Sequence, residues 1–293
     1  MLKNIKTESI IKDNSFHFID SQIETIIQLS SQFGCFCDKI ILKNGKKFVL
    51  KAQNINASLL YPSVYYEGKS LIFMNNKFKN IFPKIHHLEN NFFIMDWIDN
   101  NNITNSDSEF QLARQLAKIH TIRKSEFGFD YDTPIGSLKQ SNKYSASWIN
   151  FYRENRLQMI LDIINNSNPL PKEINKGIQK IIDGLEKYIP ESKTASLIHG
   201  DLWSGNILFN NGRLVGLIDP SICFANKEMD LASLHFLKVV SKDFISKYKN
   251  FINIEKNFED RSGIYELYYS LLNVHLWSRD YISETNKLVK KYI

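Results

Sequence analysis

Three polar side chains in the second half of the chain have the types and spacing that phosphoryl transfer requires. Asp201 and Asn206 are five residues apart, and Asp219 follows a short apolar run further on. The first spacing lets one tight loop present both side chains on the same side, while Asp219 approaches from the end of the next strand. Transfer of a phosphate from ATP to a hydroxyl needs a carboxylate beside the attacking oxygen and oxygen ligands for Mg²⁺. Asp201 is therefore expected to accept the hydroxyl proton, and Asn206 and Asp219 to hold Mg²⁺.

The nucleotide phosphates also need a cation, and Lys51 at the end of an apolar run can supply it. Glu67 lies in the next helical segment, where its carboxylate could pair with Lys51 and hold it against the α- and β-phosphates. Taken alone, Lys51 is an ordinary surface-strand lysine and Glu67 an ordinary solvated helix residue. A functional role for the pair is supported by its position, because Lys51 and Glu67 precede Asp201, Asn206 and Asp219 in the order expected for a kinase.

The segment before residue 99 is expected to form a small α+β lobe that positions Lys51 and Glu67. An Asn-Gly pair within residues 43–46 favours the positive φ angles of a tight hairpin turn. Apolar residues at helical spacing predict one helix carrying Glu67. The expected elements are strands at 38–42 and 47–53, a helix at 60–78, and strands at 84–88 and 91–98.

From residue 99 onward the pattern becomes mainly helical. Ser106 and Glu109 have capping-box spacing and open an amphipathic helix that reaches His120. Two more helices are predicted at 144–164 and 171–188, and a short hairpin with strands at 206–209 and 214–219 carries Asn206 and Asp219. We therefore expect an α+β fold with a nucleotide-binding lobe at 1–98 and a catalytic and substrate-binding lobe at 99–293.

Composition narrows the classes of protein that fit. With 43% hydrophobic and 23% charged residues, the 293-residue chain is typical of a folded globular protein. The net charge of +6 comes from scattered lysines without a block of like charge, which argues against nucleic-acid binding. Three cysteines, an odd number, argue against a disulfide framework and favour a reducing, cytoplasmic location. No signal peptide and no membrane span are expected, because no run of about 18 apolar residues occurs.

The motifs also resemble those of a known family. The run from His199 to Asn206 (HGDLWSGN) and the segment Ile218-Asp219-Pro220 are similar to the catalytic loop and metal-binding segment of the fructosamine kinase, or ketosamine-3-kinase, family. That family lies within the broader group of aminoglycoside and choline kinases, which usually carry other residues at the positions of Trp203 and Pro220. The resemblance covers nearly the whole chain and implies a protein-kinase-like fold with a small β-rich lobe and a larger, mainly helical lobe.

The resemblance implies transfer of the ATP γ-phosphate to the 3-hydroxyl of a ketosamine, which is the sugar adduct of an amine. It supports the roles given above to Asp201, Asn206, Asp219, Lys51 and Glu67. His199 and Asp230 are expected to order the catalytic loop. The substrate is expected to contact Trp203, Gln140, Asn142 and His275, and the nucleotide to contact Gly34 and the hinge at Asp96, Trp97 and Ile98.

The chain departs from the family pattern in three places. Its nucleotide loop, residues 32–37, contains the single glycine Gly34 where the family usually has two. Cys35 falls where some members carry a redox-sensitive cysteine, so a monomer is expected that could form a redox-linked dimer. The segment at 277–281 lacks the family's usual Phe-Gly step. This departure affects the acceptor pocket that the resemblance implies.

Two other functions fit parts of the pattern. A kinase for another small alcohol, such as an aminoglycoside, choline or homoserine, would share the phosphate machinery and differ only in the acceptor pocket. A pseudokinase that binds nucleotide without turnover would fit the reduced glycine loop. The complete set of charged and polar residues from Lys51 to Asp219 argues against the second alternative.

Overall fold

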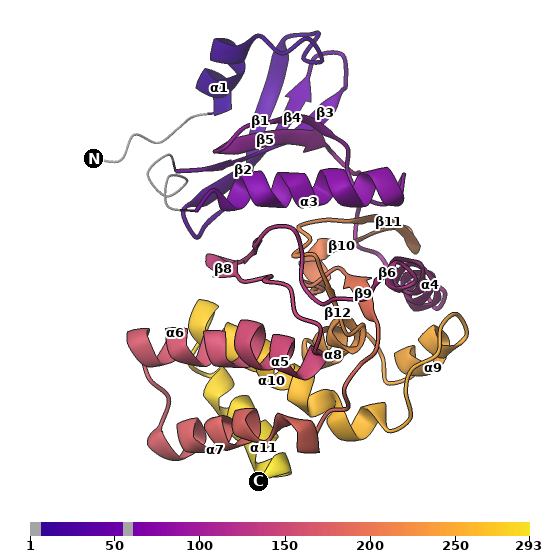
Figure 1. Cartoon of the computed structure of the whole chain (residues 1–293). Coiled ribbons are helices and arrows are strands. Elements are labelled where there is room, and N and C mark those ends of the chain that lie inside the picture. The colour runs from indigo at the N-terminus through magenta and orange to yellow at the C-terminus, as the bar shows by residue number, and fades with distance from the viewer. Residues whose placement is uncertain (1–6, 55–60) are drawn as a thin grey trace.

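The computed structural model describes residues 7–54 and 61–293 and has two lobes (Figure 1). The small lobe consists of a β-sheet with helices on its two faces. The large lobe lies below it in the view and is mainly helical, with the C-terminus at its base. The predicted boundary after residue 98 falls in the connection between the last strand of the small-lobe sheet and the first helix of the large lobe.

The small lobe is built on a five-stranded antiparallel sheet in the order β1-β2-β3-β5-β4. The strands are β1 (Ile23–Gln32), β2 (Cys35–Leu42), β3 (Lys47–Gln53), β4 (Ile85–Leu88) and β5 (Phe92–Asp96). Helix α1 (Thr7–Asn14) packs on one face through Ile10 and Ile11, and α3 (Ser63–Lys77) packs on the other.

The alternation of side chains along β3 decides which of them face α3 and the large lobe. Phe48, Leu50 and Ala52 belong to the apolar cluster under α1, whereas Val49 belongs to the larger core that includes α3. Because successive side chains of a strand point to opposite faces, Lys51 shares the face of Val49. The sheet therefore directs the Lys51 ammonium toward α3 and the large lobe.

The predicted hairpin, helix and second strand pair of the small lobe are confirmed, with small shifts at their ends. The start predicted for the helix, Leu60, lies outside the described residues. In the turn of the β2–β3 hairpin only Gly45 has a positive φ, of 84°, so the prediction of positive angles for both residues of the Asn-Gly pair was wrong. The Gly45 N–H donates to Leu42 O at 2.8 Å, as in a type I turn followed by a left-handed residue.

The large lobe contains the helices that support the catalytic segments. They are α4 (Ser108–His120), α5 (Trp148–Tyr152), a π-helical stretch (Arg153–Gln158), α6 (Met159–Ser167), α7 (Lys172–Asp183), α8 (Glu228–Phe236), α9 (Phe244–Lys249), α10 (Phe258–Leu276) and α11 (Tyr281–Tyr292). Short 3₁₀ turns occur at Leu185–Lys187 and Ser204–Asn206. Most residues of α10 are buried, so this helix lies in the interior of the large lobe.

Two helix starts differ from the prediction. The helix predicted from residue 144 begins at Trp148, because the Ser147 side chain accepts a hydrogen bond from the Asn150 N–H and caps it there. The predicted capping box at the start of α4 does not form. The carboxylate of Glu109 instead binds Ser241, just before α9, and Lys247 within α9, which connects α4 to α9.

Short strands frame the catalytic segments within the helical lobe. β10 (Ile207–Asn210) and β11 (Arg213–Leu217) form the predicted hairpin. β12 (Cys223–Ala225), β9 (Ala195–Ile198) and β6 (Arg123–Lys124) form a three-stranded sheet in that order, and β7 (Thr133–Ile135) pairs with β8 (Leu138–Gln140). Within residues 7–54 and 61–293, no helix is both long and apolar enough to cross a membrane.

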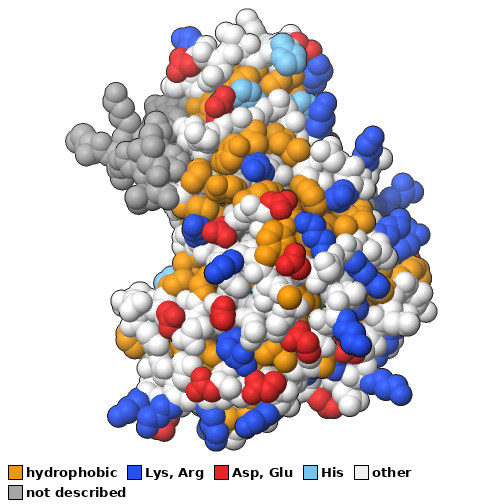
Figure 2. All heavy atoms as spheres, viewed as in Figure 1, with side chains coloured by type: hydrophobic (Ala, Val, Ile, Leu, Met, Phe, Trp, Pro, Cys, Tyr) orange, Lys and Arg blue, Asp and Glu red, His pale blue; other side chains and the backbone are white. Residues whose placement is uncertain are grey.

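On the face shown in Figure 2, hydrophobic side chains gather around the junction of the two lobes, and charged side chains of both signs cover the large lobe.

Candidate active site

Lys51 and Glu67 meet across the small lobe, as the sequence predicts. The Lys51 Nζ lies 2.7 and 2.8 Å from the two carboxylate oxygens of Glu67, and 3.2 Å from Oδ2 of Asp219. Burial alone would lower the pKa of Lys51, but the carboxylates of Asp219 and Glu67 raise it well above its ordinary value. The ammonium therefore stays charged and connects the small lobe to Asp219 of the large lobe.

The catalytic loop after β9 depends on a glycine. Gly200 has φ of +85°, and a Cβ built on it would lie 2.1 Å from the Ser221 carbonyl oxygen. The buried carboxylate of Asp230 accepts hydrogen bonds from the N–H groups of His199, at 2.8 Å, and Gly200, at 2.9 Å. Asp230 and His199 thus fix the backbone immediately before Asp201.

The environment of Asp230 extends into the core. Its Oδ2 also lies 3.1 Å from Nε2 of His120, whose Nδ1 is 2.6 Å from the Tyr248 hydroxyl. These contacts oppose the effect of burial and lower the pKa of Asp230, so the carboxylate remains ionised. His120 at the end of α4 and Tyr248 in α9 therefore brace the catalytic loop from two helices.

Asp201 and Asn206 lie together, as their spacing predicts. The Asn206 Nδ2 donates to the Asp201 backbone oxygen at 2.9 Å and to Asp201 Oδ2 at 3.2 Å. Because the amide nitrogen is used in this way, the Asn206 Oδ1 is the atom that could face a cation. Burial, and then the nearby carboxylate of Asp219, raise the pKa of Asp201 to about 7.

Asp219 follows β11 with an unusual backbone conformation, φ +52°. The segment around it is bound to the catalytic loop by two backbone hydrogen bonds, from Ile218 N to Asn206 O (3.1 Å) and from Ser221 N to His199 O (2.8 Å). The two loops are therefore held in register by each other. A positive φ in a residue other than glycine often marks a functional site, since the surrounding structure must enforce it.

No group of three or more His, Cys, Asp or Glu side chains suited to a metal occurs within the part of the chain that the structure describes. Mg²⁺ in phosphoryl-transfer sites usually takes one or two protein ligands and completes its shell with phosphates and water. The carboxylate of Asp219 and the amide oxygen of Asn206 are of the right chemical kind for such a site.

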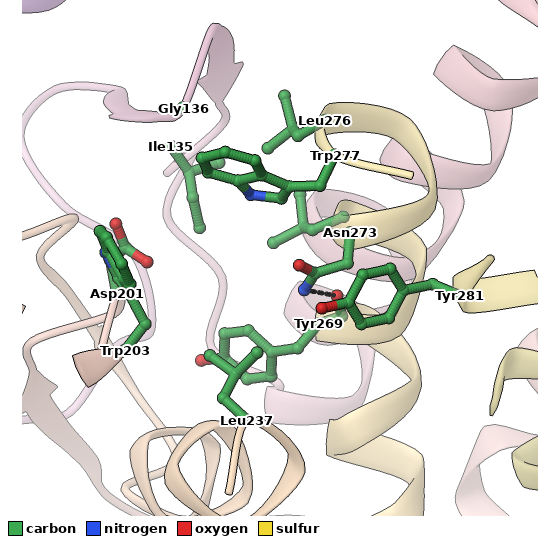
Figure 3. Close-up of a pocket in the computed structure, with 11 residues that line it drawn as sticks. Ile135, Gly136, Asp201, Trp203, Leu237, Tyr269, Asn273, Leu276, Trp277 and Tyr281 are labelled. Carbon is green, nitrogen blue, oxygen red and sulfur yellow. Dashed lines mark hydrogen bonds between the residues drawn. The ribbon is translucent and has the colours of Figure 1, made fainter. Parts of the chain in front are cut away.

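A cavity of about 320 Å³ opens beside Asp201. It lies between the catalytic loop and the C-terminal end of α10, with Asp201 and Trp203 on one side and Asn273, Leu276 and Trp277 on the other (Figure 3). The remaining lining residues are Ile135, Gly136, Leu237, Tyr269, Leu272 and Tyr281. Its walls are thus mostly apolar or aromatic, and Asp201 is the one carboxyl group among the residues that line it.

The other residues predicted to bind substrate lie elsewhere. Gln140 is buried, donates to Ser221 Oγ at 3.0 Å and accepts a hydrogen bond from the Tyr268 hydroxyl. Asn142 is also buried and accepts a hydrogen bond from the Arg156 guanidinium at 2.8 Å. Both amides are held by neighbouring protein groups, so the structure does not bring them to the cavity that Asp201 and Trp203 line.

His275 lies on a different side of α10. It lines a separate cavity of about 310 Å³ together with Asn168, Ser278 and Arg279. Trp277, the residue after the end of α10, lines both cavities. Sequence reasoning did not select Tyr269, Asn273 or Leu276 as pocket residues. The mixed polar and apolar sequence of α10 has no distinct apolar face, so nothing in it marks the few side chains that face the cavity.

The predicted nucleotide contacts lie at the edge of the small lobe. Asp96 Oδ1 is 2.6 Å from His86 Nε2, and the Trp97 N–H donates to Lys47 O at 3.4 Å. Ile98 packs close to Gly216 of β11, so the hinge touches the catalytic hairpin.

Gly34 occupies the turn between β1 and β2 with φ of +74°. Phe33 beside it also has a positive φ, of 53°, and its ring meets the Trp277 ring edge-on at 5.6 Å between centroids. The small-lobe turn therefore touches the residue that closes the far side of the Asp201 cavity.

Solved structures with the same arrangement identify the fold. A fructosamine-3-kinase candidate from Thermobifida fusca superposes with a TM-score of 0.84 at 21% identity, covering 95% of this chain and 98% of that one. An aminoglycoside phosphotransferase with ADP bound gives 0.62 at 18% identity, covering 97% and 96%. The fold is that of the protein-kinase-like phosphotransferases.

The sequence comparisons are more specific. The fructosamine kinase family model matches residues 17–293, and the chain belongs to this family. It is similar to a probable ketoamine kinase of Enterococcus faecium, 28% identical over 205 residues, or 70% of this chain and 73% of that protein. It is also similar to a protein-ribulosamine 3-kinase of Arabidopsis thaliana, 30% identical over 207 residues, or 69% and 62%.

Proposed function

We propose that the protein is an ATP-dependent kinase that phosphorylates the 3-hydroxyl of ketosamines. The observation that carries the proposal is the cavity beside Asp201, into which a sugar adduct would bring a hydroxyl next to the carboxylate. Membership of the fructosamine kinase family supports the reaction, and the names of the ketoamine and ribulosamine kinases support the acceptor.

In this proposal Asp201 accepts the proton of the attacking hydroxyl. A pKa of about 7 keeps a large fraction of the carboxylate ionised at neutral pH and makes it a competent base. Asn206 orients the carboxylate through its hydrogen bond to Oδ2. Lys51, held by Glu67, would lie against the α- and β-phosphates of ATP, and Gly34 and the hinge from Asp96 to Ile98 would contact the nucleotide.

Asp219 and Asn206 would hold Mg²⁺. The ion would neutralise charge on the phosphates and align them, which is the usual contribution of metal to this reaction. The protein supplies the rest by position, because the backbone bonds between the two loops fix both side chains relative to Asp201.

The walls of the cavity suit the proposed acceptor. Aromatic rings pack well against the apolar faces of sugars, and their π-electrons attract the protonated amine of the adduct. Trp203 is 44% exposed and lines the cavity beside Asp201, which favours a substrate contact over a role in the core. Gln140 and Asn142, buried nearby, would support the loops without touching the acceptor.

Phosphorylation at this position has a chemical consequence. The 3-oxygen is carried by the carbon next to the C2 carbonyl. Loss of a proton from C1 converts the ketosamine to its 1,2-enaminol, from which a phosphate on C3 is eliminated more readily than hydroxide. The product would therefore decompose and release the free amine. The proposed reaction thus begins the removal of sugar from glycated amines.

An ADP-release screen tests the proposal. The purified protein is incubated with Mg·ATP and, separately, ribuloselysine, fructoselysine, choline and an aminoglycoside. We expect turnover with one or both ketosamines and none above background with the other two. Turnover with choline or the aminoglycoside alone would refute the ketosamine assignment, and the absence of turnover with every acceptor would favour a nucleotide-binding protein without activity.

We also propose a monomeric, cytoplasmic protein. The free thiols of Cys35, Cys37 and Cys223 fit a reducing compartment. Burial raises the pKa of Cys35, which reduces its thiolate fraction and disfavours the redox-linked dimer. A peroxide-induced dimer that disappears in Cys35→Ser would restore the redox hypothesis.

A further inference from the structure

Tyr269 carries a polar group that the protein leaves without a partner. The residue lies in the second half of α10 and is only 3% exposed. Its hydroxyl oxygen is buried and has no hydrogen-bond partner among residues 7–54 and 61–293. Buried hydroxyls in folded proteins are nearly always hydrogen-bonded, because an unpaired one loses its interactions with water and gains nothing in return.

The orphaned hydroxyl lies at the cavity beside Asp201. Tyr269 lines this cavity together with Asp201, Trp203 and Leu237. In Figure 3 the Tyr269 ring extends from α10 toward the side of the cavity that Asp201 and Trp203 form, with its hydroxyl leading. Tyr269 thus contributes to the wall of the cavity, and its unpaired hydroxyl lies buried behind that wall, on the side of Asp201 and Trp203.

Two neighbouring tyrosines of α10 provide a comparison within the same helix. The Tyr268 hydroxyl donates to Gln140 Oε1, and the Tyr265 hydroxyl accepts a hydrogen bond from Trp148 Nε1 at 3.2 Å. Both residues are fully buried and have partners within the protein. Tyr269 thus differs from them in its lack of an internal partner and in its position at the cavity.

The chemistry of the hydroxyl fits a sugar oxygen. Burial raises the pKa of Tyr269 well above its ordinary value, so the phenol stays protonated and can donate a hydrogen bond. Around it the cavity is lined by apolar groups such as Leu237, Leu272 and Leu276. A polar acceptor bound there would have few other groups to replace its lost water.

We propose that the Tyr269 hydroxyl binds a sugar oxygen of the acceptor and thereby selects polyhydroxylated acceptors over simple alcohols. The identity of the acceptor as a ketosamine rests on the proposed function above. The role of Tyr269 is to hold the sugar so that the reacting hydroxyl meets Asp201. A phenylalanine at this position would keep the ring and remove only the hydrogen bond.

The test compares Tyr269→Phe with Tyr268→Phe in the full chain. Wild-type KM values are first measured for ribuloselysine and for ATP by ADP release, and thermal midpoints are recorded without ligand. In Tyr269→Phe we expect the KM for ribuloselysine to rise about 3- to 30-fold, as expected when one hydrogen bond is lost. The KM for ATP and the thermal midpoint should stay as in the wild type, since no internal hydrogen bond is broken.

Tyr268→Phe is the matched control, because it removes a hydroxyl that the protein itself uses. It should lower the thermal midpoint, since the Gln140 amide loses its donor. An unchanged KM for ribuloselysine in Tyr269→Phe would overturn the proposal, and so would a loss of thermal stability equal to that of Tyr268→Phe. Absence of wild-type turnover with ketosamines would instead refute the proposed function, so the two failures are distinguishable.

Discussion

Asp201 combines two properties that are separate in most aspartates. It is buried and close to another carboxylate, which raises its pKa, yet its Oδ2 is held by Asn206 and its backbone by the Asp230-bound loop. A base of this kind is both positioned and tuned toward neutral pH. These features support the proposal that Asp201 is the general base.

We predict that Asp201→Asn lowers kcat by about 10²- to 10⁴-fold, the usual contribution of a positioned general base. Nucleotide binding should persist, because Lys51 and Asp219 are untouched. The measurements are kcat by ADP release and the Kd of a non-hydrolysable ATP analogue by calorimetry. Asp13→Asn, at an exposed position of α1, serves as the control and should leave both values unchanged. A kcat for Asp201→Asn equal to the wild-type value would remove the assignment.

His199 makes stability depend on pH. Burial lowers its pKa from 6.5 to about 4 in the folded protein. Between these values the unfolded chain binds more protons than the folded one, so stability is complete above about pH 6.5 and falls as the pH drops toward 4. From pH 6.5 to 5 the loss from this one group is about 2 kcal/mol.

His199→Gln should flatten this dependence, because the substituted side chain does not titrate. Urea unfolding at pH 7 and pH 5 measures the difference in free energy of unfolding for each protein. His17→Gln, at an exposed position, should behave as the wild type does. Identical pH dependence in wild type and His199→Gln would show that another group controls acid stability.

At the scale of elements, α8 and α10 are joined by a buried ion pair. The Arg261 Nε donates to Glu228 Oε2 at 2.7 Å, and both side chains are at most 8% exposed. Helix α8 also carries Asp230, and α10 carries the wall of the cavity. The pair therefore fixes the catalytic loop relative to the acceptor pocket.

Arg261→Met is expected to lower the free energy of unfolding by about 3 to 5 kcal/mol, because Glu228 is left buried and unpaired. The double variant Arg261→Met with Glu228→Met should recover much of this loss, since no buried charge remains. Urea unfolding measures both. Lys287→Met, which breaks the exposed pair with Glu284, is the control and should have little effect. Equal loss in the single and double variants would contradict the explanation.

At the scale of the whole molecule, the two lobes meet at contacts that surround the expected nucleotide. The Lys51–Asp219 ion pair and the Phe33–Trp277 rings both connect the small lobe to the large one. A ligand that binds between the lobes stabilises the folded protein by RT ln(1 + L/Kd), where L is its free concentration. Nucleotide binding should therefore be visible as thermal stabilisation.

A non-hydrolysable ATP analogue at 100 times its Kd should stabilise the protein by about 2.7 kcal/mol. Part of this effect should require Mg²⁺ and should vanish in Asp219→Ala, whereas Glu24→Ala at an exposed position should retain it. Thermal midpoints with and without Mg²⁺ measure the effect. Persistence of the Mg²⁺-dependent part in Asp219→Ala would mean that other groups hold the metal.

Much of the catalytic centre could be predicted because its geometry is local. Asp201 and Asn206 are joined by one loop, and the two apolar runs before Asp219, connected at residues 210–213, predict a hairpin. Pairing of Lys51 with Glu67 follows from strand alternation and helix packing over a short stretch of chain. The family resemblance was confirmed for the same reason, since these local motifs carry it.

The elements that were not predicted lack a local signal. Strand β1 is an edge strand that is exposed over most of its length and is interrupted by irregular register, so its residues do not alternate. Gln140 and Asn142 were assigned to the substrate, but their partners Tyr268 and Arg156 come from distant segments. Only the folded chain brings such partners together.

By itself, therefore, the sequence determined the fold class, the family and the order of the residues proposed to bind the phosphates. The acceptor cavity was decided by tertiary structure alone. Helix α10 has polar residues scattered among apolar ones without a distinct apolar face, and most of it is buried, so its sequence does not show which residues face the cavity. The position of α10 across the cavity from the catalytic loop places Tyr269, Asn273 and Leu276 in the wall and His275 at a separate cavity.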